Sequence, residues 1–344
     1  MVLFLTSILR TDKPLKISVV HRTMKDDWRQ LAHDLEVEVK RCVSYSQLKR
    51  ILRSIDVESF NAINEAHFSS TVVCQGEFWK GVDGKELRGS IDGAAGEKRG
   101  QSVVSLTNHQ GGQSTVIGYY DGSKESEKPV VTAHFEQIGP LKDGYSFDAL
   151  HTFPRNLELI DQRGGTYLAQ VKGNQAVLLE DCALIHQHLP ADYCGQQCEK
   201  GHGRVETRRS WGYGLPASGL EERWIQTGIS SLLVVERSRY NTKTQKKSVE
   251  TAYWVSNQPF DKERFAKLFQ AARGHWAIEM HHRIRDVHMG EDQLGVRNPK
   301  EARVVAGFIT TAVNLLARQG GNMSELREKL TRNYALVDPL FKRN

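Results

Sequence analysis

The chain has 344 residues, of which 39% are hydrophobic and 26% charged, and this composition excludes a disordered or fibrous protein. No apolar run reaches the roughly 18 residues of a transmembrane helix, and the apolar start lacks the basic region and cleavage site of a signal peptide. Lysine and arginine outnumber the acids by 47 to 41, and the net charge of +6 suits a polyanionic partner such as DNA.

The cysteines indicate a reducing compartment. Their number is odd and their spacing irregular, so they do not form a disulfide scaffold. They are Cys42, Cys74, Cys182, Cys194 and Cys198. We therefore expect a cytoplasmic protein that does not contact a membrane.

The first 70 residues have the pattern of a small helical bundle. Apolar residues recur at helical spacing from Leu48 to Ile55, after Ser46 as a candidate N-cap, and Asp56 could start a further helix. The basic face of the first of these helices carries Lys49, Arg50 and Arg53. That face could contact DNA, although packing within the bundle explains the pattern equally well.

From residue 78 onward, short apolar runs alternate with turns. Strands are expected at residues 78–83, 101–107, 114–119, 144–148 and 166–171. A glycine-rich flexible loop is expected at residues 90–100 and a helix at residues 175–188. Strands that then alternate with helices predict a mixed α/β domain.

Residues 189–258 have the composition of a β-rich insertion. Residues 190–204 resemble a loop, and two runs at 230–240 and 248–256, joined by a polar turn, predict a hairpin. Further helices are expected near residues 261–288, 299–318 and 324–333. The predicted parts are a helical domain at 1–70, an α/β core at 71–188, the insertion at 189–258, and helices at 259–344 that complete the core.

Two aspartates stand where predicted strands give way to turns. Asp83 follows one strand, and Asp148 ends another. Carboxylates held by neighbouring strands, with a third from a helix, suit Mg²⁺ or Mn²⁺, and such a site can hold two ions about 3.5–4 Å apart. An aspartate followed by glycine, as at Asp83, is also an ordinary turn.

Several stretches of the chain resemble, in family order, the blocks of the DDE transposases of bacterial insertion sequences. The branch concerned includes the H-repeat-associated proteins. The stretches are VDGKELRGS (82–90), GSKESE (122–127), FDALH (147–151), YLAQVKGNQ (167–175), GHGRVETR (201–208), HWAIE (275–279), RDV (285–287) and ED (291–292). A signature of many related transposases is not met, because Ala272, His275 and Asp286 occupy its tyrosine, arginine and lysine positions.

The resemblance implies a ribonuclease-H-like mixed sheet with a β insertion before the last acidic residue. It also implies that Asp83, Asp148 and Glu279 bind two Mg²⁺ or Mn²⁺ ions and catalyse DNA strand cleavage and strand transfer. The implied partners are the insertion-sequence ends and target DNA, bound by a homodimer. A catalytically silent DNA-binding remnant and a plain metal-dependent nuclease are the alternatives.

Basic and polar residues near these blocks are candidates for DNA contacts. They are Lys85, Arg88, Lys172, Asn174, Gln175, His202, Arg204, Arg273, His275 and Arg283. The residues after position 171 could instead form an ordinary turn, and Arg204 could pair with Glu206.

Two further questions concern metal ligands. Cys194, Cys198 and His202 are ligand types for zinc, but their spacing matches no common zinc motif, so no zinc is expected. Glu206 and Glu291 compete with Glu279 as the third carboxylate. We expect a salt bridge at Glu206, a helix end or turn at Glu291 and therefore a mild effect of its replacement.

Overall fold

The structure is a computed structural model. It describes every residue except 1, 13–14, 35, 37, 39–40, 70–77, 122–125, 202, 217–219 and 342–344. The chain divides into two compact units. Unit 1 comprises Met1–Cys74, Gly84–Val130 and Ala277–Asn344, and unit 2 comprises Gln75–Asp83 and Val131–Trp276. The fold is mixed α/β with helices at both ends of the chain, as predicted for the ribonuclease-H-like class.

Unit 2 contains a mixed sheet in which parallel strands are followed by antiparallel ones. β1 (Trp79–Glu86) begins in this unit and runs parallel to β4 (Gly144–Phe147), which runs parallel to β5 (Thr166–Val171). Antiparallel strands follow β5 in the order β9 (Lys247–Ser256), β8 (Ser231–Asn241), β7 (Arg204–Gly214) and β6 (Tyr193–Gly201). Every residue of β4 is buried, so the parallel part of the sheet is a rigid support.

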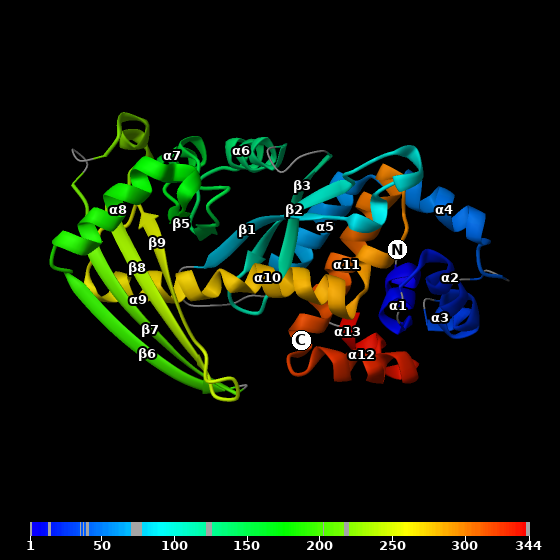
Figure 1. Ribbon diagram of the computed structural model, residues 1–344. Coiled ribbons are helices and arrows are strands. Elements are labelled where there is room, and N and C mark those ends of the chain that lie inside the picture. Colours follow the sequence, from blue (N-terminus) through cyan, green and yellow to red (C-terminus); the bar gives the residue numbers. More distant parts are fainter. Residues whose placement is uncertain are drawn as a thin grey trace. The chain divides into compact units, whose positions relative to one another are not determined.

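Two helices cover opposite faces of the long antiparallel strands (Figure 1). α9 (Lys262–Gly274) packs against Trp254, whereas α8 (Ala176–His188) places the His186 ring 6.4 Å from that of Tyr253. Trp254 and Tyr253 are neighbours in β9, so their side chains point to opposite faces. Unit 2 also contains α7 (Pro154–Gln162), a 3-10 helix (Glu222–Thr227) and most of α6 (Glu127–Gln137).

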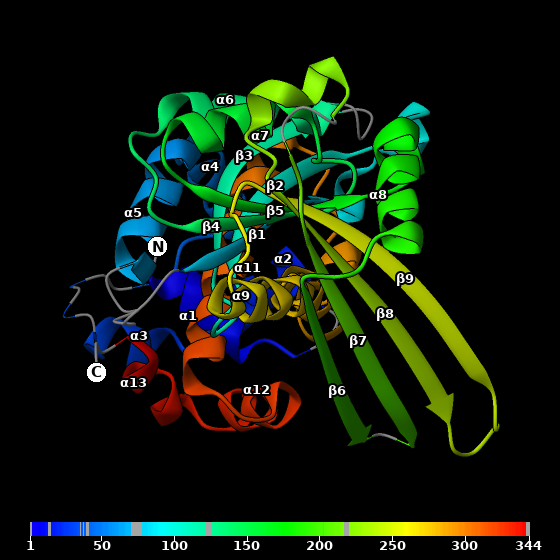
Figure 2. The ribbon, with the colours of Figure 1, turned by 90° about the vertical axis from the view of Figure 1, so that its left-hand side faces the viewer.

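The loop expected at residues 190–204 is largely a strand, and that prediction was wrong. β6 pairs with β7 over its whole length and ends the strand order, where Figure 2 shows it beside β7. Its side chains are mostly polar and are half-buried or exposed throughout. The apolar alternation that identifies a strand in a sequence is therefore missing. The predicted hairpin is confirmed, because β8 pairs antiparallel with β9.

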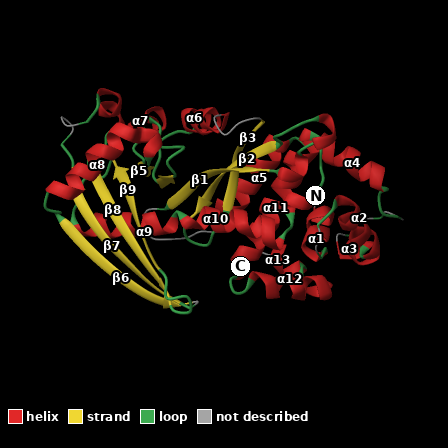
Figure 3. Cartoon of the chain, in the orientation of Figure 1, coloured by secondary structure: helices red, strands yellow, loops and turns green. Residues whose placement is uncertain are grey.

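In unit 1, helices from both ends of the chain pack with the remaining strands. β3 (Ser114–Asp121) pairs antiparallel with β2 (Gln101–Asn108), and β1 is the next strand in the sheet order. α11 (Pro299–Gln319) is buried along most of its length. The other helices, drawn in Figure 3, are α1 (Val2–Arg10), α2 (Ile17–Asp26), α3 (Trp28–Asp34), α4 (Tyr45–Ser54), α5 (Val57–Ser69), α10 (Trp276–Arg283), α12 (Met323–Arg332) and α13 (Asp338–Phe341).

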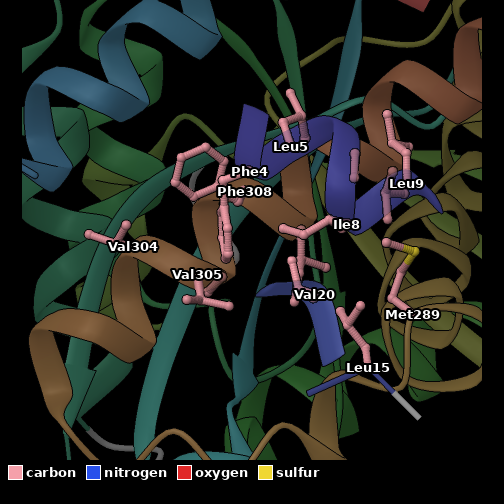
Figure 4. Packing of buried hydrophobic residues seen from close by; sticks show 14 of the residues in the cluster. Phe4, Leu5, Ile8, Leu9, Leu15, Val20, Met289, Val304, Val305 and Phe308 are labelled. Carbon is pink, nitrogen blue, oxygen red and sulfur yellow. The ribbon is translucent and has the colours of Figure 1, made fainter. Parts of the chain in front are cut away.

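The core of unit 1 joins the first helix to α11. Phe4 packs edge-to-face on Phe308 with ring centroids 5.0 Å apart, and Figure 4 shows Ile8 and Val20 close by. Burial of a large apolar side chain contributes about 1.5–3 kcal/mol, so this contact ties the chain's two ends firmly together. Among the helices that the structure describes, none is long and apolar enough to span a membrane.

The N-cap of α4 differs from the prediction. Ser44, not Ser46, caps this helix: the Gln47 amide donates to Ser44 Oγ, and the Ser44 amide donates to Gln47 Oε1. The sequence contains this capping box as serine followed three residues later by glutamine. The predicted helix start at Asp56 is confirmed, since its carboxylate accepts from the Ser59 amide.

Candidate active site

Asp83 and Asp148 occupy equivalent places on two adjacent parallel strands of unit 2. β1 and β4 are in register from Trp79 with Gly144 to Val82 with Phe147. Each aspartate directly follows the last of these pairs, so the two carboxylates are the next residues in the same register. Asp83 does not end its strand as predicted, because β1 continues to Glu86. It lies where the pairing with β4 stops.

The turn after β4 holds the Asp148 side chain in place. Asp148 Oδ1 accepts hydrogen bonds from the amides of Leu150 at 3.0 Å and His151 at 3.2 Å. The Thr152 hydroxyl donates to the Asp148 carbonyl at 3.0 Å. Both amide bonds go to the same oxygen, so Oδ2 of this half-buried carboxylate can face a ligand.

The segment after β5 supports this turn from the next strand. The Asn174 side-chain amide donates to the Ala149 carbonyl, and that of Gln175 donates to the Thr152 carbonyl, both at 2.6 Å. Lys172 is exposed beside them. Of these three predicted DNA contacts, Asn174 and Gln175 have partners within the turn, and the exposed Lys172 has no partner in these bonds.

His151 lies next to Asp83. A ring nitrogen of His151 and a carboxylate oxygen of Asp83 are within 4.8 Å of each other. The His151 side chain is fully buried, and its backbone amide is one of the two that donate to Asp148. One short turn therefore positions a carboxylate and an imidazole beside the aspartate of β1.

His275 closes the back of the same region in unit 2. It is buried, its Nδ1 lies 2.8 Å from the Ser146 hydroxyl of β4, and its ring packs against Trp254. Burial lowers the pKa of His275 to about 4, although the negative charge of Asp148 acts in the opposite direction. This predicted DNA contact is a neutral residue inside the protein at physiological pH.

In unit 1, a buried acid lies against the next residue of β1. A Cβ added at Gly84 would collide with the carboxylate of Glu127, which accepts a hydrogen bond from the Tyr120 hydroxyl at 2.9 Å. Glu127 is the first residue of α6, where a negative charge is favoured by the helix dipole. The Glu127 carboxylate therefore lies against β1 at Gly84, the residue that follows Asp83.

The basic residues that follow Asp83 face the C-terminal acids of unit 1. The buried Lys85 ammonium lies 2.5 Å from Asp286 and 3.3 Å from Asp292, and Arg88 is exposed with Asp292 at 3.9 Å. Burial raises the pKa of Asp286, and the contact with Lys85 opposes that rise. These residues line a polar pocket of about 310 Å³ that also contains Arg99.

The C-terminal acids differ in their partners. Glu291 is buried and forms a two-pronged ion pair with the fully buried Arg285, at 2.6 and 2.8 Å. Glu279 and Arg283 are both exposed on α10, which Ile278 anchors by its burial. Glu291 thus has a structural partner, whereas the Glu279 side chain is open to solvent.

The insertion strands hold an ionic cluster of their own. Glu206 is buried between Arg208, with which it pairs, and Arg239 at 3.3 Å, and Arg204 stands 3.9 Å away. The salt bridge expected at Glu206 is confirmed. Arg273 at the end of α9 binds Glu199 at 2.5 Å. Cys194 and Cys198 are exposed on β6, and His202 lies outside the described residues.

Comparison with known proteins identifies relatives of the chain. No protein-family model matches the chain. The H repeat-associated putative transposase YhhI of Escherichia coli K12 is 28% identical over 258 residues, 72% of this chain and 66% of that protein. Putative transposase YncI of Escherichia coli O157:H7 is 27% identical over 317 residues, 86% of this chain and 76% of its own length. The chain is thus similar, over most of its length, to putative transposases of the H-repeat-associated branch.

A third relative has a less specific name. Putative protein YbfL of Escherichia coli K12 is 29% identical over 258 residues, 72% of this chain. The match to YbfL, like that to YhhI, spans 66% of the relative's length, slightly under two thirds.

The donor groups around β1 and β4 of this chain fit a divalent ion. Asp83 offers hard carboxylate oxygens, which Mg²⁺ and Mn²⁺ prefer, and the neighbouring His151 offers a nitrogen that suits Mn²⁺ better than Mg²⁺. Asp148 offers a second carboxylate, directly after the last residue of β4 that pairs with β1. The neutral state of His275 adds no positive charge to oppose a cation.

Sequence reasoning missed His151 and Glu127. Each stands inside a stretch that resembles a family block, FDALH and GSKESE. The sequence signal was therefore present, but only the pairing of strands shows which residues of those stretches lie beside β1.

Proposed function

We propose that this protein is a transposase that cuts DNA at the ends of an insertion sequence and joins the freed ends to target DNA. The observation that carries the proposal is the register of β1 and β4, in which Asp83 and Asp148 directly follow the last pair, Val82 with Phe147. Both reactions are in-line phosphoryl transfers, which depend on positioned charge rather than on a covalent intermediate with the enzyme.

The proposed metal ligands are Asp83, Asp148 and Glu279, with Mg²⁺ or Mn²⁺ as the ion and two ions at the site. A bound pair would activate the attacking oxygen and neutralise charge on the leaving oxygen. We add His151 as a candidate ligand because of its distance from Asp83. Glu279 is proposed from the family resemblance and from its exposed position on α10.

The protein's own contribution is to hold these groups still. Two amides fix one oxygen of Asp148, and side chains from the end of β5 fix the turn that supplies those amides. A catalytic group must stay within about 0.5 Å of its productive place, and groups on a buried parallel sheet meet that requirement better than groups on loops.

We propose that exposed basic residues contact the DNA backbone. The basic residues among the predicted DNA contacts that are exposed are Arg88, Lys172, Arg204 and Arg283. Such contacts position DNA without reading its sequence and weaken as salt rises. We further propose that a homodimer binds two element ends in the cytoplasm.

The test is to incubate the protein with element-end DNA and Mg²⁺ and to map the products. Wild type should release a free 3′-hydroxyl at the element end. Asp83→Asn, Asp148→Asn and Glu279→Gln should each abolish cleavage and keep DNA affinity near wild type, whereas Glu199→Gln, which removes an exposed carboxylate of the insertion, should cut normally. Cleavage by an aspartate variant would refute the assignment, and binding without cleavage by wild type would favour the silent remnant.

A further inference from the structure

A second basic site lies in unit 1, and it includes Lys49 and Arg53 of the basic helix face noted in the sequence. A pocket of about 590 Å³ opens between the start of α2, the basic face of α4 and the start of α11. The cations among the described residues that line it are Lys16, Lys49, Arg53 and Arg297, and the acid among them is Glu301. The pocket therefore carries an excess of positive charge.

Glu301 does not neutralise that excess. Its carboxylate is buried and accepts a hydrogen bond from Nε of Arg53 at 3.1 Å, with Lys49 at 3.8 Å. Within the described chain this contact uses only Nε of Arg53, so both Nη groups remain available to a ligand. Glu301 also lies in the first turn of α11, which by itself stabilises a negative charge. We conclude that Glu301 fixes the two cations in position and leaves a net positive surface.

The other two cations are held more loosely. Lys16 is exposed and forms no ion pair with a described residue, and Arg297 is exposed with Asp92 at 3.4 Å. An exposed pair of this kind contributes roughly 0–1 kcal/mol, so a stronger anion can displace it. Both side chains can therefore turn toward a ligand in the pocket.

The backbone adds donors to the same surface. α2 starts at Ile17 without a side-chain cap from Lys16, and both Ile17 and Ser18 line the pocket. The amides of a first helical turn have no partner within the helix, and they bind phosphate oxygens well. They supplement the side-chain cations rather than defining the site.

We propose that this pocket binds the phosphate backbone of duplex DNA, as a contact separate from the candidate active site. Four cations around about 590 Å³ are more than one phosphate group requires, and they suit successive phosphates of a strand. Arg50, exposed next to Lys49 on α4, extends the basic surface beyond the pocket. The identity of the ligand as DNA rests on the proposed function.

The contrast with the pocket beside β1 supports this choice. There, Lys85 is already bound by two aspartates, so that pocket contains neutralised cations. Here, one buried carboxylate faces four cations. Electrostatic attraction of a polyanion needs uncompensated charge, and the pocket at α4 has more of it.

The test compares a double variant with a matched control. Lys16→Gln with Arg297→Gln removes two cations that do not anchor Glu301. Lys329→Gln with Arg332→Gln removes two exposed cations of α12 in the same unit. The affinity for a duplex of the element end is measured by fluorescence anisotropy over a range of salt, without divalent metal.

The plot of log affinity against log salt should become shallower by about 0.9 for each lost phosphate contact, or about 2 in total, in the first variant only. Equal slopes in both variants would overturn the proposal. Thermal unfolding checks that each variant is folded. If the double variant does not fold, the single variant Lys16→Glu is a second test, and it should still weaken DNA binding.

Two parallel measurements separate the possible failures. If calorimetry shows that wild type binds inorganic phosphate, that the double variant loses this binding, and that the DNA slope is unchanged, the pocket takes small anions and the proposal is wrong. Cleavage by wild type and Asp83→Asn is followed on the same DNA. An unchanged slope with normal cleavage refutes only the pocket, whereas a reduced slope without cleavage refutes only the catalytic proposal.

Discussion

The turn after β4 and the C-terminal acidic segment both contain carboxylates within family-like blocks, but the two regions treat them differently. In unit 2, Asp148 is held by backbone amides, and the histidine behind it is neutral. In unit 1, Glu291 is locked to Arg285, and Lys85 stands between Asp286 and Asp292. In the first arrangement no cationic side chain neutralises the carboxylate, so its charge can attract a metal ion. In the second, arginine and lysine side chains neutralise the carboxylates.

The hydrogen-bond and ion-pair partners of an acidic residue, rather than its place in a motif, therefore indicate its role. A carboxylate bound by amides keeps its charge and its orientation and can still coordinate a cation. A carboxylate buried with arginine stabilises the fold only while both partners are present. On this criterion Asp148 is a candidate ligand, Glu291 is structural, and Glu279 stays a candidate because it is exposed.

The largest expected effect comes from breaking the buried pair. Glu291→Gln leaves the Arg285 guanidinium buried without its counter-charge, which should cost about 3–5 kcal/mol of unfolding free energy. This replaces the mild effect that the sequence suggested, because the sequence does not show that Glu291 is buried. Urea denaturation followed by circular dichroism measures it.

Glu325→Gln is the matched control, because Glu325 forms an exposed pair with Lys329 on α12. Loss of an exposed helical pair should cost only about 0.3–0.5 kcal/mol. If the two variants unfolded at the same urea concentration, the structural role assigned to the buried Glu291 would lose its main support.

A smaller effect concerns pH and the neutral histidine. The pKa of His275 is about 4 in the folded protein, below the ordinary value of 6.5, because the ring is buried. As pH falls below 6.5 the unfolded chain takes up a proton that the folded chain refuses until about pH 4. The stability contributed by the neutral ring is therefore complete above pH 6.5 and is lost between pH 6.5 and 4, on the order of 3 kcal/mol.

His275→Gln should lose less stability than wild type over that pH range, as measured by urea midpoints at several pH values. Part of the acid sensitivity should remain, because burial also lowers the pKa of His134 to about 4 and that of His281 to about 3. His188→Gln, which alters an exposed histidine of α8, is the control and should follow wild type. A His275→Gln curve that also follows wild type would show that this ring is not held neutral.

Much of the fold could be predicted because its strands are apolar or end at clear turns. The runs that became β2, β3, β4 and β5, and the hairpin of β8 with β9, were all visible in the sequence. β6 was missed because its side chains are polar and largely exposed. β6 is a strand because it pairs with β7, and this tertiary interaction cannot be predicted from the pattern of residues along the chain.

For the candidate site, the sequence indicated which residues matter better than how they are bound. Asp148 was placed at its strand end, but Asp83 lies within β1 because that strand continues past its pairing with β4. His151 and the Glu291–Arg285 pair were missed since their significance depends on burial and on partners chosen by the fold. Spacing along a chain carries no information about such partners.

The central claim, that Asp83 and Asp148 hold a divalent ion, is tested most directly by titrating Mn²⁺ into the protein and following its binding by electron paramagnetic resonance. Wild type and Glu199→Gln should bind Mn²⁺ alike, because Glu199 pairs with Arg208 and Arg273 on the insertion. Asp83→Asn and Asp148→Asn should each weaken binding by more than the roughly 10-fold typical of losing an outer-shell partner. Wild-type affinity in either aspartate variant would contradict the account.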